Sequence, residues 1–392
     1  MGCVCGGHSS LGDLMQALHI SRVSPLAVTR PSATHPEGFP LFPLPDDLAA
    51  SLAREGNTLT VGMAMMAARE ALSQAQLTPE ALIPEKTGVC LGSSTGASIQ
   101  FFEYRKALAC RKDADPSVFL ASLSYNPGPA LARSLCGKPS SAKGPQALTV
   151  TNACTAGADA IGTGMAWLRQ KLCDIVLAGG TDELCVTSIT GFSRLLIMSN
   201  ELCRPFDAGR KGLNLGEGAA VLVLERMGHA LQRGATPIAI LSGYGTAADA
   251  YHLTAPHPQG NGLKAALRAV MREAGISTDQ VAFINAHGTG TQENDKTEAH
   301  VFRELFPHTP ISATKGITGH TLGAAGAIEA AITIACLRDG KLPPSPGFTT
   351  PHPDLGIGPV TRVTPISGEY AISESLAFGG NNSALAFSKA TQ

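Results

Sequence analysis

The sequence predicts an α/β protein made of two similar halves, because two patterns each occur twice along the chain. The first pattern is a helix, a short connector, a buried strand and a glycine loop, found at 59–96 and again at 262–290. In the second pattern, a Gly/Ala-rich helix opens directly after a reactive side chain, which is Cys154 in one half and His320 in the other. Two such halves would bring Cys154 and His320 together across a pseudo-twofold axis.

The composition is that of a globular protein with balanced charge. Its 392 residues suffice for two packed units, and its net charge of −1 argues against nucleic-acid binding. The sequence has no run of about 18 apolar residues, so no membrane span is expected. The ten cysteines are scattered without paired spacing, which favours reduced thiols and a cytoplasmic protein over a disulfide framework.

The first half is expected to span residues 1–235, with an insertion at about 97–145. Its segments are, in order, a turn and short helix at 2–20, a Pro- and Gly-rich surface excursion at 21–57, a helix at 59–76, a strand and Gly/Ser loop at 87–96, and a helix at 155–172. The second half is expected to span residues 236–392. Its segments are a helix at 262–274, a connector at 276–279, a strand and Gly/Thr loop at 281–290, and a Gly/Ala-rich helix at 321–331.

Cys154 stands at a predicted strand-to-helix turn. Apolar, β-branched residues end at Ala153, and the helix-like run starts at Thr155. Because amide groups at a helix N-terminus favour negative charge, we expect the pKa of this thiol to fall toward thiolate. The alternative is an inert buried cysteine, since free cysteines are often buried.

Two histidines strengthen the catalytic interpretation of Cys154. His287 follows an apolar strand, and His320 precedes a helix, both among small residues. A neutral imidazole that donates through one nitrogen can stabilise a developing enolate or oxyanion. A single histidine would favour a structural role, whereas two histidines and a cysteine in matching places favour catalysis. The other histidines show no metal-ligand spacing, so no metal site is expected.

The loop 376–382 near the C-terminus has neither a helix nor a strand pattern. Its glycines would let backbone amides approach a substrate oxygen, and the alternative is a plain turn.

Taken together, the motifs make the chain resemble an elongating β-ketoacyl-acyl-carrier-protein synthase of the thiolase fold. The motifs that carry the resemblance are Thr151-Asn-Ala-Cys154, Asn285-Ala-His-Gly-Thr-Gly-Thr291, Lys315-x4-His320-x8-Glu329, Cys203-Arg-Pro-Phe-Asp207, Gly212-Leu-Asn-Leu-Gly-Glu-Gly218 and Phe378-Gly-Gly-Asn-Asn382. The resemblance covers nearly the whole chain. It implies a five-layered α/β/α/β/α arrangement with the active site between the halves.

The resemblance implies a decarboxylating Claisen condensation, in which acyl-acyl-carrier protein and malonyl-acyl-carrier protein give 3-oxoacyl-acyl-carrier protein. The pathway would be fatty-acid, polyketide or aryl-polyene chain elongation. Cys154 matches the nucleophile that takes the acyl chain, and His287 and His320 match the pair that supports decarboxylation. Lys315 matches a buried lysine that organises the second histidine, and Glu329 matches a carboxylate of the same network.

Further residues match the substrate-binding parts of the family. Thr289 and Thr291 match the hydroxyls that hold the phosphopantetheine arm, and Asp295 matches a second network carboxylate. Phe378 matches the aromatic gate, and its backbone amide would join that of Cys154 in the oxyanion hole. No cofactor is implied, because the substrates arrive on the phosphopantetheine arm of the carrier protein.

The implied partners are acyl carrier protein and a second subunit, in a homodimer or in a heterodimer with a chain-length-factor-like homologue. We expect the dimer interface to include parts of residues 97–130, where apolar and aromatic residues are too numerous for an exposed loop. These residues are Phe101, Phe102, Tyr104, Phe119 and Tyr125. Arg210 and Lys211 are the candidates for docking the acidic carrier protein, and a solvated surface pair is the alternative.

The chain also departs from the family pattern. It starts at the first glycine turn, so the opening strand is either very short or preceded by residues upstream of Met1. Leu376-Ala-Phe378 replaces a more aromatic pattern, and Asn381 stands where threonine is usual. The stretches that most resemble the aryl-polyene branch are 210–216, 248–260 and 292–295.

The alternative function is that of a non-catalytic, chain-length-factor-like partner in a ketosynthase heterodimer. Such subunits resemble this chain but lack the nucleophile, whereas Cys154 is present here. If the chain is catalytic, we expect alkylating agents to label Cys154 before the other cysteines.

Overall fold

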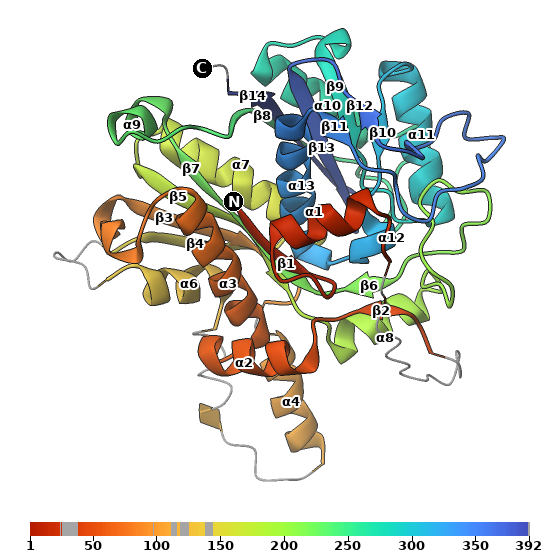
Figure 1. The fold of residues 1–392 in the computed structure, drawn as a ribbon. Helices are drawn as coiled ribbons and strands as arrows, with labels where there is room; N and C mark the ends of the chain where they lie inside the picture. Colours follow the sequence, from red (N-terminus) through yellow and green to blue (C-terminus); the bar gives the residue numbers. More distant parts are fainter. Residues whose placement is uncertain are drawn as a thin grey trace.

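The computed structural model describes residues 1–23, 25, 38–96, 98–110, 116–117, 125–137 and 144–390. Two five-stranded sheets form its centre (Figure 1). The first sheet has the order β4-β3-β5-β7-β1, and its strands are Gln146–Val150, Thr87–Gly92, Ile175–Asp182, Gly218–Glu225 and Gly2–Cys5. The second sheet has the order β10-β9-β13-β14-β8, and its strands are Ile311–Ser312, Val281–Asn285, Tyr370–Ala377, Asn381–Lys389 and Ala239–Ala248.

The two sheets share one pairing pattern, which confirms the prediction of two similar halves. Along each order as written, the first two pairings are parallel and the last two are antiparallel. β4 and β10, which precede Cys154 and His320, are the parallel edge strands of their sheets. The chain passes from the first sheet to the second between Glu225 and Ala239.

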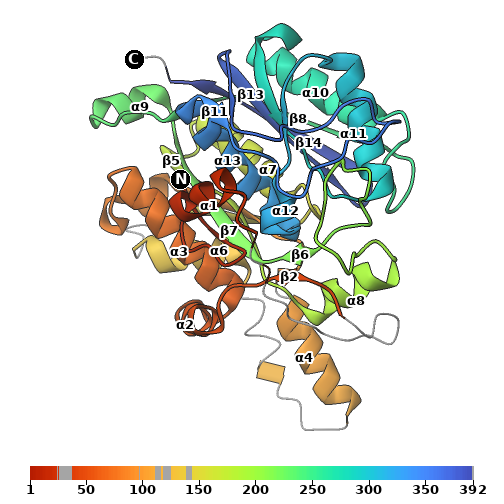
Figure 2. The same cartoon turned by 45° about the vertical axis from the view of Figure 1, so that its right-hand side comes forward.

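Helices form three layers around the sheets, as Figure 2 shows. α3 (Leu59–Gln74) and α6 (Pro127–Leu135) pack on the outer face of the first sheet. α7 (Ala156–Arg169) and α13 (Ala325–Asp339) lie between the two sheets, and α10 (Asn261–Ala274) covers the outer face of the second. The predicted five-layered α/β/α/β/α fold is therefore confirmed.

The central helices can lie between two sheets because their sequences are apolar and small. Every residue of α13 from Ala325 to Leu337 is buried, as expected for a helix that is covered on all sides. Close approach needs glycine at Gly157, where a Cβ atom would lie 2.7 Å from the carbonyl oxygen of Gly323. The Gly/Ala-rich pattern therefore allows the two halves to meet close to the site.

The remaining elements surround this core. They are α1 (Leu11–His19), β2 (Leu41–Phe42), α2 (Asp46–Gly56), 3-10 turns at Pro79–Ala81 and Pro84–Lys86, α4 (Ser98–Ala109), α8 (Val186–Arg194), β6 (Leu215–Gly216), α9 (Met227–Gln232), a 3-10 turn at Thr278–Gln280, α11 (Gln292–Leu305), α12 (Lys315–Thr318), a 3-10 turn at Leu322–Ala324, β11 (Lys341–Leu342) and β12 (Thr364–Pro365). Within the described residues, no helix combines the length and the apolar character that a membrane crossing needs.

The prediction of a surface excursion at 21–57 is wrong for its last part, because Asp46–Gly56 form the helix α2. Asp46 and Asp47 occupy the first turn of α2, where carboxylates are stabilised by the helix dipole. Within the predicted insertion, α4 projects away from the body of the molecule (Figures 1 and 2).

Candidate active site

Cys154 lies at a sharp turn between β4 and α7. Ala153 has a φ of 47°, a left-handed conformation that is uncommon for residues other than glycine. The turn directs Cys154 toward the second half, and the first helical residue follows at Ala156. The cysteine side chain is almost fully buried, with a relative exposure of 5%.

His320 is held next to Cys154 by its own backbone. Its N–H donates to the carbonyl oxygen of Asn214 at 2.8 Å, and its carbonyl oxygen accepts from Gly216 at 3.1 Å. Gly319 has a φ of 63°, and a Cβ there would lie 2.8 Å from the ring of Phe42. The result is a separation of 3.1 Å between His320 Nε2 and Cys154 Sγ.

His287 lies beside His320, with ring centroids 5.1 Å apart and planes at 85°. Lys315 Nζ lies 3.0 Å from His287 Nδ1 and also pairs with Glu329. Because a lysine ammonium can only donate, Nδ1 is the acceptor, and the proton of a neutral His287 is on Nε2. His287 Nε2–H is therefore available as a hydrogen-bond donor.

The role implied for Lys315 is corrected by this geometry. The family resemblance implied that Lys315 organises the second histidine, His320, but its direct hydrogen bonds go to His287 and Glu329. The physical reason is the short helix α12, whose first residue is Lys315, followed by the turn at Gly319. His320 comes after this turn, where its ring meets Cys154.

Burial sets the protonation of all three reactive groups. It lowers the pKa of both His287 and His320 well below the usual range, and the charge of Lys315 lowers both further. Burial raises the pKa of Cys154 to about 12, while Lys315 and the Phe378 amide act in the opposite direction. The prediction of a lowered cysteine pKa is therefore wrong, because the loss of hydration outweighs the lowering effects of Lys315 and the Phe378 amide. The resting site holds a neutral thiol beside the neutral imidazole of His320, with His287 next to His320.

A cavity of about 370 Å³ opens onto these groups. Thr289 and Thr291 line it, with their hydroxyl oxygens 2.8 Å apart, where a polar ligand chain could bind. Phe378 also lines it and stacks on Phe192, with centroids 5.3 Å apart and an angle of 17°. The backbone amide of Phe378 hydrogen-bonds the Cys154 sulfur, which is the direction an oxyanion hole requires.

The loop around Phe378 is a tight hairpin turn. β13 runs to Ala377 and β14 begins at Asn381, so the prediction of no strand pattern is wrong for the two ends of 376–382. Gly379 and Gly380 have φ values of 86° and 77°, which a hairpin turn of this kind requires. This hairpin turn therefore forms part of the cavity wall.

Several buried carboxylates that support the site were missed by the sequence analysis. Asp182, at the end of β5, accepts from Ser93 Oγ at 2.6 Å and from the amides of Ser94 and Gly323, both at 2.7 Å. It therefore ties the glycine loop of the first half to the segment that follows His320. The sequence signal that could have identified Asp182 as a supporting residue is its position at the end of an apolar strand.

The second half contains a pair of buried carboxyls, Glu298 and Glu374, which the sequence analysis also missed. They accept the backbone N–H groups of Gly288 and His287. The predicted network residue Asp295 accepts from the amides of Phe206 and Gly290 at 2.6 and 3.1 Å. These carboxyls hold the loop that carries His287.

Arg210 does not lie on the surface, which corrects its assignment as a docking residue. Its side chain is buried against Asp295, with Nε 3.8 Å from the carboxylate, and donates to the carbonyl of Asp207. Lys211 is exposed, pairs with Glu201 and lines the mouth of the cavity.

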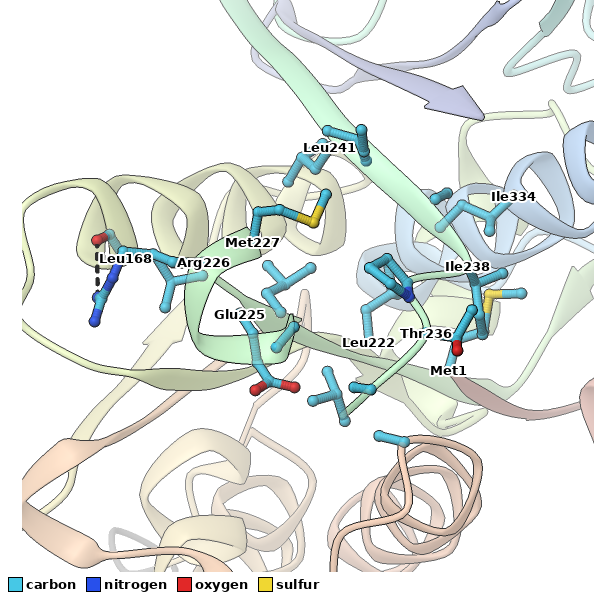
Figure 3. Close-up of a pocket in the computed structure, with 18 of the residues that line it drawn as sticks. Met1, Leu168, Leu222, Glu225, Arg226, Met227, Thr236, Ile238, Leu241 and Ile334 are labelled. Carbon is cyan, nitrogen blue, oxygen red and sulfur yellow. Dashed lines mark hydrogen bonds between the residues drawn. The ribbon is translucent and has the colours of Figure 1, made fainter. Parts of the chain in front are cut away.

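A second cavity, of about 540 Å³, lies where the two halves join (Figure 3). Leu168, Leu222, Ile238 and Ile334 contribute apolar side chains to it. None of the described residues that line it is cysteine or histidine. Cys154, His287 and His320 all line the smaller cavity.

A thiol, two neutral imidazoles and a buried lysine on a doubled α/β fold define an enzyme that forms a covalent thioester. Known protein families agree with this class. "Beta-ketoacyl synthase, N-terminal domain" matches residues 59–230, and "Beta-ketoacyl synthase, C-terminal domain" matches residues 238–349. The chain belongs to the β-ketoacyl synthase family.

Individual relatives cover nearly the whole chain. The 3-oxoacyl-[acyl-carrier-protein] synthase 2 of Staphylococcus aureus (strain COL) is 37% identical, over 92% of this chain and 89% of its own. The ishigamide ketosynthase/chain length factor superposes with a TM-score of 0.89 at 28% identity, covering 100% and 98% of the two chains. The ketosynthase ApeO of Xenorhabdus doucetiae, solved with its chain length factor ApeC, gives 0.79 at 29% identity, covering 99% and 96%.

Proposed function

We propose that this chain condenses an acyl-acyl-carrier protein with malonyl-acyl-carrier protein to give 3-oxoacyl-acyl-carrier protein and carbon dioxide. The observation that carries the proposal is the 3.1 Å separation of Cys154 Sγ and His320 Nε2, with His287 beside them as a donor. The name of the Staphylococcus aureus relative supports the same reaction.

The first step is acyl transfer to Cys154. Because the thiol is neutral at rest, its proton passes to His320 Nε2 as the sulfur attacks the acyl thioester carbonyl. The tetrahedral oxyanion accepts hydrogen bonds from the amides of Phe378 and Cys154. The intermediate collapses, and the phosphopantetheine thiolate leaves with the proton from His320.

The second step is decarboxylation. The C–C bond to the malonyl carboxylate breaks, carbon dioxide leaves, and the electron pair forms the enolate of the remaining thioester. His287 donates through Nε2–H to the enolate oxygen, because Lys315 occupies its Nδ1. His320 is neutral again after the first step, with its remaining proton on Nδ1, because Nε2 has returned the thiol proton. A shift of that proton to Nε2 through solvent lets His320 donate to the same oxygen.

In the last step, the enolate carbon attacks the Cys154 thioester carbonyl. The oxyanion again uses the amides of Phe378 and Cys154, and the collapse expels the cysteine thiolate, which takes a proton from water. Every bond and proton is accounted for by these side chains, the substrates and solvent. We therefore propose that no metal or cofactor takes part.

The proposed partners follow from the site. The phosphopantetheine arm of acyl carrier protein would lie along Thr289 and Thr291, which line the cavity near Cys154. That all ten cysteines are free supports a cytoplasmic location.

The proposed assembly is a dimer of this chain, or a heterodimer with a chain-length-factor-like homologue. Phe101 and Phe102 on the projecting helix α4 are 42% and 38% exposed, and Leu148 on the edge strand β4 is 42% exposed. Exposed apolar side chains beside an open sheet edge favour an interface. Tyr125 is half-buried, and Phe119 lies outside the described residues. Two structural relatives, each named as a ketosynthase with a chain length factor, support the heterodimeric form.

The experiment is an assay of the purified chain with acyl- and malonyl-acyl-carrier proteins, read by intact-protein mass spectrometry. We expect an acyl adduct on Cys154 and a 3-oxoacyl product, alone or with a homologous partner. A chain that never accepts an acyl group in either setting would instead be the non-catalytic chain-length-factor-like subunit. A panel of saturated and polyunsaturated acyl chains tests the aryl-polyene branch.

Alkylation alone is a poor substitute for this assay. Cys110 is exposed, whereas Cys154 is buried with a raised pKa, so the prediction that alkylation labels Cys154 first does not follow from the structure. Acyl transfer from the substrate is selective for Cys154 because it requires the neighbouring imidazole.

A further inference from the structure

Two glutamates with no part in the steps above lie directly behind the turn that carries His287. Glu374 is in β13 at the centre of the second sheet, Glu298 is in α11, and both are fully buried. Glu374 Oε1 accepts the N–H of His287 at 2.6 Å, and Glu298 Oε2 accepts the N–H of Gly288 at 2.9 Å. Two successive amides at the end of β9 are therefore each held by a carboxyl.

The turn itself explains why two separate acceptors are needed. Gly288 has a φ of 46°, so its amide no longer follows the direction of the strand. A Cβ there would lie 3.1 Å from the Cβ of Ala313 and 3.3 Å from the ring of Phe206, so the loop is also closely packed.

The carboxyl groups of Glu298 and Glu374 lie next to each other, because they accept from the successive amides of Gly288 and His287. Burial raises the pKa of both, and the Glu374 carboxyl raises that of Glu298 further. Two carboxylates in contact without water cannot both be ionised, so one of the two must carry a proton. Within the described part of the chain, Glu374 Oε2 receives no N–H or hydroxyl hydrogen bond. This oxygen is therefore free to carry the proton and donate it to Glu298.

The surrounding charges favour a single negative charge on the pair. Asp295 in α11 repels a charge on Glu298, and the amide of Asn294 donates to Glu298. Lys315 in α12 attracts a charge on Glu374, but it also pairs with Glu329 in α13. One lysine thus faces both Glu329 and the pair, so its attraction is divided between Glu329 and the charge on Glu374.

We propose that Glu298 and Glu374 form a positioning pair that shares one proton and fixes the backbone of His287. Because His287 is held at its N–H by Glu374 and at its carbonyl and Nδ1 by Lys315, its Nε2–H has one direction, toward the substrate oxygen. Removing the shared proton would drive the carboxylates apart and release the amide. The inference rests on the proposed function and assigns two further residues to the same site.

Infrared difference spectroscopy of the resting full-length protein tests the shared proton without any assay of activity. Glu298→Gln and Glu374→Gln should each remove one carboxylic-acid carbonyl band from the wild-type spectrum, because the remaining partner then stays ionised. The exposed Glu369→Gln is the matched control and should remove none. If both variants keep every carboxylic-acid band of the wild type, the proposal is overturned, whatever the enzyme's substrate.

Kinetics then test positioning. Glu374→Gln keeps both hydrogen bonds, since its amide oxygen accepts from His287 and its NH₂ donates to Glu298. Glu374→Leu keeps neither, and we expect malonyl-carrier-protein decarboxylation to fall about 10²-fold while Cys154 acylation persists. Glu374→Gln should retain most of the decarboxylation rate and should lose any alkaline decline seen in the wild type. Equal loss in both variants, or an unchanged alkaline decline in Glu374→Gln, would overturn the positioning role.

Discussion

The turns at Cys154 and His320 occupy matching places in the two halves, whereas the turn at His287 is built differently. The first two each follow a parallel edge strand and precede a helix between the sheets. Cys154 is set by backbone conformation, through the left-handed Ala153 and the start of α7. His320 is likewise held by its own backbone. His287 is instead held by side chains, with Lys315 on its Nδ1 and carbonyl oxygen and Glu374 on its N–H.

The difference teaches how one duplicated fold divides a reaction between its halves. The first half supplies the nucleophile, and burial keeps its thiol neutral. The second half concentrates the charged groups that fix tautomers and aim donors. Mutations in the first half should therefore remove the covalent step, and those in the second should remove the carbanion step.

The largest effect is expected for Cys154→Ala. Removing the sulfur should abolish the acyl adduct and lower condensation by about 10⁴-fold or more, while the fold survives because alanine fits the same space. Intact-protein mass spectrometry measures the adduct, and circular dichroism checks the fold. Cys110→Ala, at the exposed cysteine, is the control and should react normally. An adduct that persists in Cys154→Ala would remove this residue as the nucleophile.

The second prediction separates the two steps through the histidines. His287→Ala should still form the Cys154 thioester, but decarboxylation should fall by about 10²–10³-fold, the effect of losing one oxyanion donor. His320→Ala should impair decarboxylation similarly and also slow acylation, because Cys154 loses the acceptor of its proton. Single-turnover acylation and carbon dioxide release measure the two steps. Normal carbon dioxide release in His287→Ala would contradict the role of the second half.

The third prediction tests the contact between the central helices. Gly157→Val should destabilise the protein by about 3 kcal/mol, because the new side chain meets the backbone at Gly323. Gly326→Val should cost less, about 1–2 kcal/mol, since its neighbours at 3.0 Å include the side chains of Ala158 and Ser375. Gly228→Val is the control, because nothing lies within 4 Å of its Cβ position. Denaturant unfolding measures all three, and equal stability of Gly157→Val and Gly228→Val would refute the close contact.

The sequence predicted the reactive groups better than their surroundings. Cys154, His287 and His320 stand in local motifs with small neighbours, so their placement at turns could be inferred from the order of residues. The pKa of Cys154 could not, because the helix start is local whereas burial comes from the second half. Arg210 looked like a surface charge, and only the fold brings Asp295 against it.

The supporting carboxyls escaped prediction for a related reason. Asp182 ends an apolar strand, and Glu374 lies within one. Their hydrogen-bond partners are far away in the sequence: Gly323 is 141 residues from Asp182, and His287 is 87 residues from Glu374. Lys315 was recognised, but its partner histidine depends on how α12 and the Gly319 turn are oriented. The sequence alone therefore does not show which distant residues pair with a buried charge.

The fourth prediction concerns the cavity mouth. Reversing the charge of Lys211 should weaken acyl-carrier-protein binding by about threefold at low salt, because an exposed pair contributes little. The salt dependence of binding should also flatten. Arg268→Glu is the matched control, an exposed basic residue of another surface pair that does not line the cavity. Fluorescence anisotropy measures the affinity, and equal effects of Lys211→Glu and Arg268→Glu would exclude Lys211 from docking.

The smallest effect is expected for pH, and it follows from the opposite shifts in the two halves. A histidine with the ordinary pKa of about 6.5 would be roughly three-quarters protonated at pH 6, which would slow acylation about fourfold. The pKa of His320 is instead lowered well below that value, first by burial and then by Lys315, so the imidazole stays neutral as the pH falls through 6.5. The pKa of Cys154 is raised to about 12, so the thiol does not ionise near neutrality either. We therefore expect single-turnover acylation to change less than about twofold between pH 6 and pH 8. A fourfold decline with a midpoint near 6.5 would show that the pKa of His320 is not lowered, and it would contradict the burial of this imidazole between the two halves.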